Sequence, residues 1–277
     1  MFLVSTPNGK VGTHVAQQLI AQGLPVRIGA HTVEKARQAF QGAEVVALNL
    51  FDPESAAAAL EGVSALYLAS PGDAPAAPIT AVVDRARAAG VQRVVQLSAS
   101  GVEQGDSPLR QIERHIEASG MSWTFLRPNW FMQNYSTQHQ HTIKAQGAFY
   151  EPADEGATAF IDARDIAAVA VAALTQDGHA GQAYTLTGGR AYTRHEVAAT
   201  LSQALGREIR YVPQDDAQFR ETMAAFMPQD YIEMLSSLYG MVRAGWTAAV
   251  SPEVERLLGR APISLAQFAR DERNAWA

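Results

Sequence analysis

The feature that most constrains this chain is the alternation of short apolar runs with segments of helical periodicity across its first half. The runs lie at 2–5, 26–29, 45–48, 65–69, 93–97 and 122–126, and apolar residues recur every three or four positions between them. Strands and helices that alternate in this way form βαβ units with parallel strands and right-handed crossovers. The sequence therefore predicts an α/β fold with a doubly wound parallel sheet in the order 3-2-1-4-5-6.

The connection between the first expected strand and helix reads VSTPNGKVG over residues 4–12. A pyrophosphate bound at a helix N-terminus needs main-chain N–H groups, and no side chain where the backbone approaches it. Gly9 supplies the close approach, Gly12 lets the helix pack on the strand, and Lys10 adds positive charge. Thr6 and Pro7 follow the strand where the usual first glycine would stand, so an ordinary structural turn is the alternative. The predicted phosphate-binding residues are Thr6, Asn8, Gly9, Lys10, Val11 and Gly12.

The pattern changes after about residue 129. A polar stretch at 133–146 and a loop at 151–156 are followed by short apolar strands at 184–186 and 209–212. Helix starts are expected at Asp52, Ser107, Asp165, Thr193 and Ser264, each of which can cap a helix N-terminus. We therefore expect a dinucleotide-binding domain over residues 1–155. Residues 156–277 would complete the sheet and form a smaller, mostly helical substrate lobe.

Composition excludes several classes of protein. The net charge of −6 and the pI near 5.6, with only Lys10, Lys35 and Lys144 as lysines, leave no basic patch for nucleic acid or a membrane surface. The absence of cysteine excludes disulfides and thiolate metal sites, and no histidine pair has metal-ligand spacing, so no metal is expected. No apolar run approaches the length of a membrane span, and no leader precedes the first strand, so we expect a cytoplasmic protein.

Several stretches together resemble the NmrA-like branch of the atypical short-chain dehydrogenases, in order and spacing. They lie at 5–12, 26–36, 88–91, 97–101, 125–134, 162–167, 184–188, 208–213 and 243–245. The resemblance runs nearly end to end and implies a Rossmann fold that binds NADP(H) or NAD(H). The family includes quinone, dye and azo-compound reductases, and redox-sensing regulators without clear catalysis.

The segment after the second strand bears on the choice of nicotinamide cofactor. A 2′-phosphate needs cations there, whereas a free 2′-hydroxyl favours a carboxylate. His31 stands where the family commonly has arginine, Lys35 matches a family lysine, and no acidic residue ends the strand. These residues favour NADP, with NAD as the alternative and with His31 as an ordinary loop histidine if it makes no contact.

The other expected ligand contacts follow the carboxyl ends of later strands, the edge where open α/β sheets bind ligands. The family-like cofactor contacts are Asn49, Leu50, Ala69, Ser70, Pro71, Ser98, Ala99 and Pro128. Ser70 and Ser98 could equally satisfy local backbone groups. Asn129, Trp130, Phe131 and Tyr135 are expected at the substrate, where the aromatic rings suit a flat apolar acceptor. Packing between the domains is the alternative for Trp130 and Phe131.

Typical short-chain dehydrogenases reduce carbonyl groups with a tyrosine that is activated by a lysine four residues later. None of the eight tyrosines has such a lysine, and Leu109 stands where relatives can carry lysine or histidine, so no catalytic residue is assigned. Hydride transfer to a quinone, azo bond or dye gives a product that water can protonate. The sequence thus favours an NAD(P)H-dependent reductase of a small planar conjugated acceptor.

Two other functions stay open. A non-catalytic NAD(P)-sensing regulator would also lack the tyrosine–lysine dyad and would tolerate Thr6 and His31. An isomerase that uses the fold without net redox change is a more remote reading. In each case the expected partner is a small molecule, and a hydrophobic helix face would be compatible with a homodimer.

Overall fold

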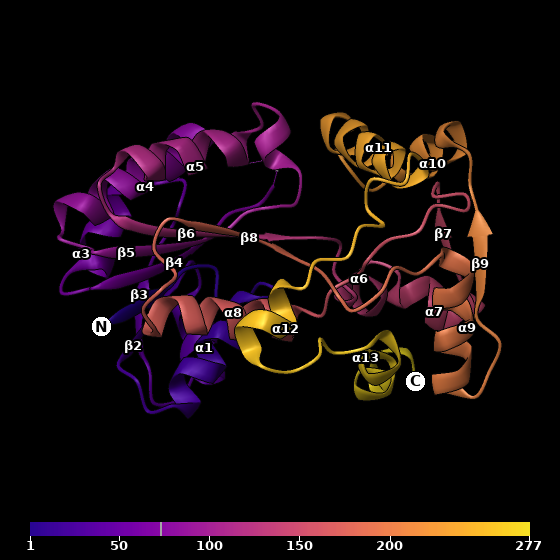
Figure 1. The fold of residues 1–277 in the computed structure, drawn as a ribbon, viewed down its shortest axis with the longest axis horizontal. Helices are drawn as coiled ribbons and strands as arrows, with labels where there is room; N and C mark the ends of the chain where they lie inside the picture. The colour runs from indigo at the N-terminus through magenta and orange to yellow at the C-terminus, as the bar shows by residue number, and fades with distance from the viewer. Residues whose placement is uncertain (73) are drawn as a thin grey trace. The chain divides into compact units, whose positions relative to one another are not determined.

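The computed structural model describes residues 1–72 and 74–277 (Figure 1). The chain divides into two compact units, and neither is continuous in sequence. Unit 1 comprises Met1–Pro128 and Ala163–Leu186, and unit 2 comprises Asn129–Asp162 and Thr187–Ala277. The chain therefore passes from unit 1 to unit 2, returns for one helix and one strand, and then stays in unit 2.

Unit 1 is built on a seven-stranded sheet in which the neighbouring strands pair in parallel. Its strands, in spatial order, are β3 (Glu44–Ala47), β2 (Val26–Ala30), β1 (Phe2–Val4), β4 (Ala65–Ala69), β5 (Arg93–Leu97), β6 (Ser122–Pro128) and β8 (Gln182–Leu186). The predicted order 3-2-1-4-5-6 is confirmed, and β8 extends it beside β6. The order reverses between β1 and β4, which is the point where open sheets of this kind bind ligands.

Helices cover both faces of this sheet, as Figure 1 shows. One layer contains α1 (Gly12–Ala21), α2 (Val33–Ala39) and α8 (Ala163–Thr175), and the other contains η1 (Pro53–Ser55), α3 (Ala56–Leu60), α4 (Ala76–Ala88) and α5 (Pro108–Ala118), with the turn η2 (Val102–Gln104) before α5. The second layer packs Ile79, Val82 and Ile112 against Leu66 and Phe125 of the sheet. Because both faces are covered, the strands are apolar along most of their length.

The helix starts mostly follow the predicted caps. The Ser107 hydroxyl accepts a hydrogen bond from the Arg110 N–H at 3.3 Å at the start of α5. Asp52 caps the 3₁₀ turn η1 instead of an α-helix. The prediction for Asp165 is wrong, because α8 begins at Ala163 and Asp165 lies buried in its first turn.

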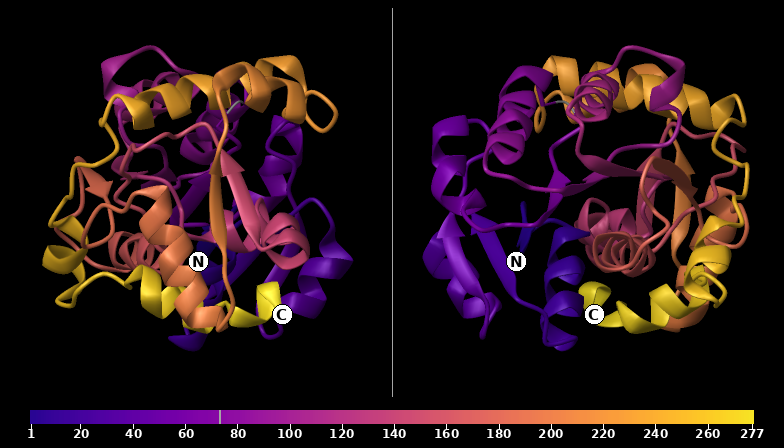
Figure 2. Two further views of the ribbon diagram at one scale, coloured as in Figure 1. Left: turned by 90° about the vertical axis from the view of Figure 1, so that its right-hand side faces the viewer. Right: turned by 60° about the vertical axis from the view of Figure 1, so that its left-hand side comes forward.

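Unit 2 is mostly helical, as expected, with a small parallel sheet of β7 (Ala148–Glu151) and β9 (Arg210–Pro213), seen side by side in the left view of Figure 2. Its helices are α6 (Gln133–Thr137), α7 (Gln140–Gln146), α9 (Arg194–Leu205), α10 (Asp216–Met223), α11 (Gln229–Arg243), α12 (Glu253–Leu258), α13 (Leu265–Asp271) and η3 (Arg273–Trp276). A capping box between Thr193 and Glu196 opens α9, as predicted. The polar stretch at 133–146, for which no structure was predicted, forms α6 and α7. Over the described ranges, no helix is both long enough and apolar enough to cross a bilayer.

A buried ion pair lies inside unit 2. The Arg194 side chain is fully buried, and its Nε donates to Glu151 Oε2 at 2.7 Å while Nη1 donates to Thr158 Oγ1 at 2.6 Å. His139 Nε2 lies 2.9 Å from the other carboxylate oxygen of Glu151. Burial by itself would raise the pKa of Glu151, but the Arg194 charge and the His139 hydrogen bond outweigh it and lower that pKa to about 2.

We expect Glu151→Gln to lower the free energy of unfolding by about 3 kcal/mol at pH 7, because it leaves the Arg194 charge buried and unpaired. The folded pKa of Glu151, about 2, lies below its ordinary value of 4.5, so its contribution is complete above pH 5 and is lost as the pH falls through about 2. Urea unfolding should therefore show that the wild type and Glu151→Gln differ less in free energy of unfolding near pH 3 than at pH 7. Glu155→Gln, at an exposed carboxylate, is the control, and an equal effect of both substitutions would contradict the prediction.

Candidate functional site

The loop after β1 takes the conformation that a glycine would normally supply. Thr6 has a φ of +48°, in the left-handed region that residues with a side chain rarely adopt. Its carbonyl oxygen accepts a hydrogen bond from the Gly9 N–H at 3.0 Å. Next to it, the Ser5 hydroxyl accepts from the Ala69 N–H at 3.0 Å, which joins the loop to the end of β4. Thr6 thus occupies the place of the missing glycine without opening the turn.

Gly12 is required by a close backbone approach. A Cβ at residue 12 would lie 2.3 Å from the Thr6 carbonyl oxygen, and one at Gly9 would lie 3.3 Å from the same atom. The first of these distances is far inside van der Waals contact. The loop therefore passes directly over the first residue of α1, and only glycine fits there.

The N-terminus of α1 carries no side-chain cap, since Val11 provides none. The first N–H groups of a helix have no partner within the helix and attract anions. The Thr13 hydroxyl lies 2.7 Å from the Pro7 carbonyl oxygen and 2.9 Å from that of Gly9, which fastens the loop to the first turn. Pro7 is buried, whereas Asn8 and Gly9 are exposed to solvent. The proline ring therefore does not cover the turn. These features fit a diphosphate.

Lys10 lies in the same loop and is partly buried. Burial lowers the pKa of its ammonium group, because the charged form loses solvation. An anion bound beside it would favour the charged form again. The residue therefore suits a role next to phosphate groups.

The other predicted cofactor residues follow the carboxyl ends of neighbouring parallel strands, so unit 1 brings them to one edge of its sheet. His31 follows β2 and Lys35 lies in the first turn of α2, and both are exposed. The Asn49 side chain accepts a hydrogen bond from the Phe51 N–H at 3.0 Å and shapes the turn after β3. The remaining residues of the set are Leu50, Ala69, Ser70, Pro71, Ala99 and Pro128, at the ends of β3, β4, β5 and β6.

Ser98 is the most informative member of this set. Its side chain is buried, yet its hydroxyl has no hydrogen-bond partner among the described residues. Its N–H donates to the Leu126 carbonyl oxygen at 2.7 Å, so the backbone is fixed while the hydroxyl is not satisfied. Buried hydroxyls are nearly always hydrogen-bonded, so a bound ligand at this edge would supply the missing partner.

The four predicted substrate residues belong to unit 2. Asn129 is held by its own contacts, with Nδ2 donating to the Thr247 carbonyl oxygen at 2.8 Å. Trp130 and Phe131 are half-buried, and the Trp130 ring lies 4.9 Å from that of Tyr239. Tyr135 is fully buried. Trp130 and Phe131 thus keep exposed surface, whereas Tyr135 packs in the core of unit 2, and their role at a substrate stays a prediction.

Four of the eight tyrosines have raised pKa values. Burial raises the pKa of Tyr67, Tyr135 and Tyr239 well above the ordinary value, and it raises that of Tyr211 to about 12. A phenol that donates a proton near neutral pH needs its pKa shifted in the opposite direction. Leu109, in α5, is buried as a core residue. None of these four tyrosines therefore has the lowered pKa of an activated proton donor.

One group near this edge was missed by the sequence analysis. Glu113 of α5 is fully buried, and Arg127 of β6 donates to both of its oxygens, at 3.0 and 2.8 Å. A carboxylate on the same helix face as Leu109, Ile112 and Ile116 is the signal that could have revealed it, because a charge on an apolar face needs a partner.

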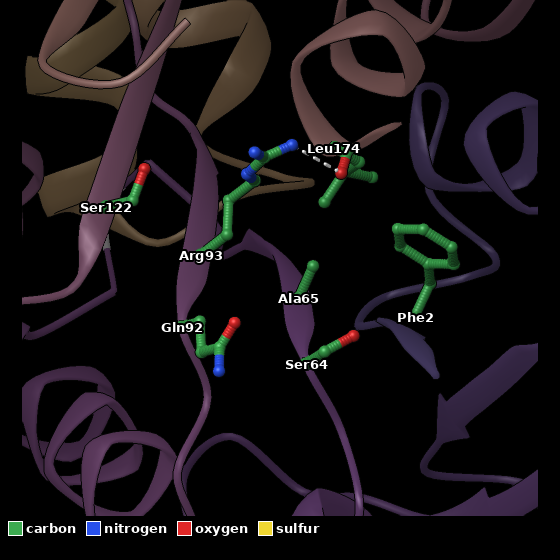
Figure 3. Close-up of a pocket in the computed structure, with 7 residues that line it drawn as sticks. All are labelled: Phe2, Ser64, Ala65, Gln92, Arg93, Ser122 and Leu174. Carbon is green, nitrogen blue, oxygen red and sulfur yellow. Dashed lines mark hydrogen bonds between the residues drawn. The ribbon is translucent and has the colours of Figure 1, made fainter. Parts of the chain in front are cut away.

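One hollow lies away from this edge and does not belong to the site. A hollow of about 290 Å³ lies at the amino ends of β1, β4, β5 and β6, the opposite edge of the sheet (Figure 3). Arg93 reaches across it to the Leu174 carbonyl oxygen at 2.9 Å. Within the part of the chain that the structure describes, no three His, Asp or Glu side chains are grouped to hold a metal ion.

Comparisons with known proteins agree with this geometry. The NAD(P)H-binding family matches residues 7–177. The chain is 35% identical to the NAD(P)H azoreductase of Xenophilus azovorans over 98% of this chain and 97% of the relative. It is also 35% identical to the (4-alkanoyl-5-oxo-2,5-dihydrofuran-3-yl)methyl phosphate reductase of Streptomyces griseus, over 100% of this chain and 99% of the relative.

A solved structure points the same way. The NADPH-dependent quinone oxidoreductase of Escherichia coli, in complex with NADPH, superposes with a TM-score of 0.84 and 25% identity over 98% of this chain and 99% of that one. The family match covers more than half of the chain, and it includes Gly9 and Gly12 of the loop after β1. The chain therefore belongs to the NAD(P)H-binding family, as its resemblance to the NmrA-like branch of the atypical short-chain dehydrogenases implied.

Proposed function

We propose that this protein is an NAD(P)H-dependent reductase that transfers hydride to a small planar conjugated acceptor of the azo or quinone type. The observation that carries the proposal is the nearly full-length similarity to an NAD(P)H azoreductase, on a chain whose loop after β1 has Gly9 and Gly12. The bound nicotinamide would supply the hydride. Unit 1 would bind the nucleotide through the α1 N-terminus and Ser98.

The proposed acceptors follow from the chemistry that the protein lacks. No tyrosine has a lysine four residues later, so a carbonyl group would lack the proton donor that typical short-chain dehydrogenases supply. A quinone or azo group delocalises the charge it gains, and water can then protonate it. Half-buried Trp130 and Phe131 offer flat apolar surface that suits such acceptors.

We expect the protein to oxidise NADPH in the presence of quinones or azo dyes, and to leave simple aldehydes and ketones unreduced. Steady-state absorbance of the reduced nicotinamide, with a panel of these acceptors, measures both. Rapid reduction of simple ketones would contradict the proposed chemistry. Tight nucleotide binding without turnover of any acceptor would instead favour a regulator that senses NAD(P).

NADPH is the proposed cofactor, because exposed His31 and Lys35 flank the end of β2 where a 2′-phosphate would lie. We expect Lys35→Ala to weaken NADPH binding about tenfold, since a phosphate contact is lost, and to leave NADH binding within about twofold. Calorimetric titration of both nucleotides tests this, with Lys144→Ala as the matched exposed-lysine control. Equal weakening of NADPH and NADH would overturn the assignment of Lys35 to the 2′-phosphate.

The nucleotide loop itself can be tested at Gly12. We expect Gly12→Ala to weaken binding of either nucleotide at least about tenfold, because the new Cβ would meet the Thr6 carbonyl oxygen and displace the loop. Gly9→Ala should have a smaller effect, since its Cβ would lie 3.3 Å from that oxygen. Gly189→Ala, whose Cβ would meet no atom within 4 Å, is the control. Unchanged affinity in Gly12→Ala would argue against a diphosphate at this loop.

A further inference from the structure

A network of charged side chains lies in unit 1 beside the carboxyl ends of β5 and β6. Its members are Glu103, Arg110, Glu113, Glu117 and Arg127. The Glu113 carboxylate is fully buried and receives Arg127 Nε at 3.0 Å, Arg127 Nη2 at 2.8 Å and Arg110 Nη1 at 2.9 Å. Arg127 Nη1 also lies 3.4 Å from Glu103 Oε2 in η2. Arg110 in turn contacts Glu117 at 2.9 Å. Arg127 therefore connects a strand, a helix and a loop.

The loop in question begins with the predicted cofactor residues Ser98 and Ala99. Leu97 lies opposite Leu126, and the pairing continues beyond β5, because the Ser100 N–H donates to the Pro128 carbonyl oxygen at 3.0 Å. The Ser98 N–H likewise donates to the Leu126 carbonyl oxygen, so Arg127 lies between the two residues of β6 whose carbonyl oxygens bind this loop. The loop then turns at Gly101, with a φ of +85°, and reaches Glu103.

The Glu113–Arg127 pair has a rigid geometry. A guanidinium that donates two parallel hydrogen bonds to one carboxylate has a single favourable orientation, and lysine cannot reproduce it. Both side chains are shielded, with Glu113 fully buried and Arg127 13% exposed. Solvent therefore screens the pair weakly, and removing either partner would let the other move.

We propose that Glu113 and Arg127 are positioning residues for the nicotinamide end of the cofactor, and that they act by holding the Ser98–Gly101 loop through Glu103. The proposal rests on the proposed binding of NAD(P)H at this sheet edge. The buried Ser98 hydroxyl, which lacks a partner among the described residues, lies at the start of the loop that the pair would hold together with the backbone hydrogen bonds to β6. The phosphates and adenosine would be bound elsewhere, by the loop after β1 and the end of β2.

Because different residues would bind the nicotinamide end and the phosphate end of the cofactor, two ligands that differ only in the nicotinamide can be compared. NADPH carries the nicotinamide, whereas 2′-phospho-ADP-ribose is the same nucleotide without it. We expect Arg127→Lys and Glu113→Gln to bind NADPH about tenfold more weakly than the wild type, because a displaced loop loses contacts at that end alone. Both variants should bind 2′-phospho-ADP-ribose within about twofold of the wild type. Calorimetric titration of the two ligands measures this.

Glu103→Gln provides a gentler variant, because it releases the loop and leaves the buried pair intact. It should weaken NADPH binding in the same selective way by a smaller factor, and it decides the test together with Arg127→Lys if Glu113→Gln does not fold. Arg114→Gln, which removes an exposed ion pair between Arg114 of α5 and Asp106 in the loop before it, is the control and should change neither affinity. Equal weakening of both ligands, or of neither, in Arg127→Lys and Glu103→Gln would overturn the proposal.

The readout is binding, so it does not depend on turnover. A wild type that binds both nucleotides and reduces no acceptor would reject the proposed reductase and leave this test valid. Where turnover is found, kcat in Arg127→Lys should fall about tenfold at saturating NADPH with the KM for the acceptor unchanged, since the hydride donor is misplaced and the acceptor pocket is not. A purely stabilising role would leave kcat unchanged below the unfolding temperature.

Discussion

The approach of the first loop to α1 leaves no room for a side chain at residue 12, and the nucleotide site begins with that contact. The Thr6 carbonyl oxygen occupies the space where a Cβ would be, and Thr6 itself takes a left-handed conformation to put it there. The helix N-terminus is thereby brought beneath an exposed turn, and Val11 provides no side-chain cap for it. Backbone geometry defines this part of the site, which is why threonine can stand where a glycine is usual.

In each unit a glutamate is held beside an arginine, fully or almost fully out of water. Arg127 and Arg110 surround Glu113 in unit 1, and Arg194 and His139 surround Glu151 in unit 2. Such pairs add little net stability over well-packed apolar residues, but breaking one is costly. They therefore specify an arrangement more than they stabilise it: Glu113 with Arg127 joins α5 to β6, and Glu151 with Arg194 joins β7 to α9.

Most of unit 1 could be predicted because its pattern is local. Each strand and helix is readable from its own apolar period, and right-handed crossovers leave few strand orders to choose from. The region at 133–151 could not be predicted in this way. Its two short helices and β7 are polar outside a few inward residues, and Phe149 is buried against Tyr211, some sixty positions later in the chain. Asp165 was misplaced because capping residues are also common within the first turn.

For the site, the sequence by itself predicted a nucleotide loop and the strand ends that would line a cofactor, and it showed that no tyrosine has a lysine four residues later, because these depend on residue type and short spacing. Only the tertiary structure decided that Thr6 adopts a left-handed conformation, that the Ser98 hydroxyl is buried without a partner in the described residues, and that Glu113 meets Arg127. Those facts depend on which backbone atoms and charges come together across strands and helices. The pattern within a single strand or helix does not specify these contacts, since the same residues in another register would meet different partners.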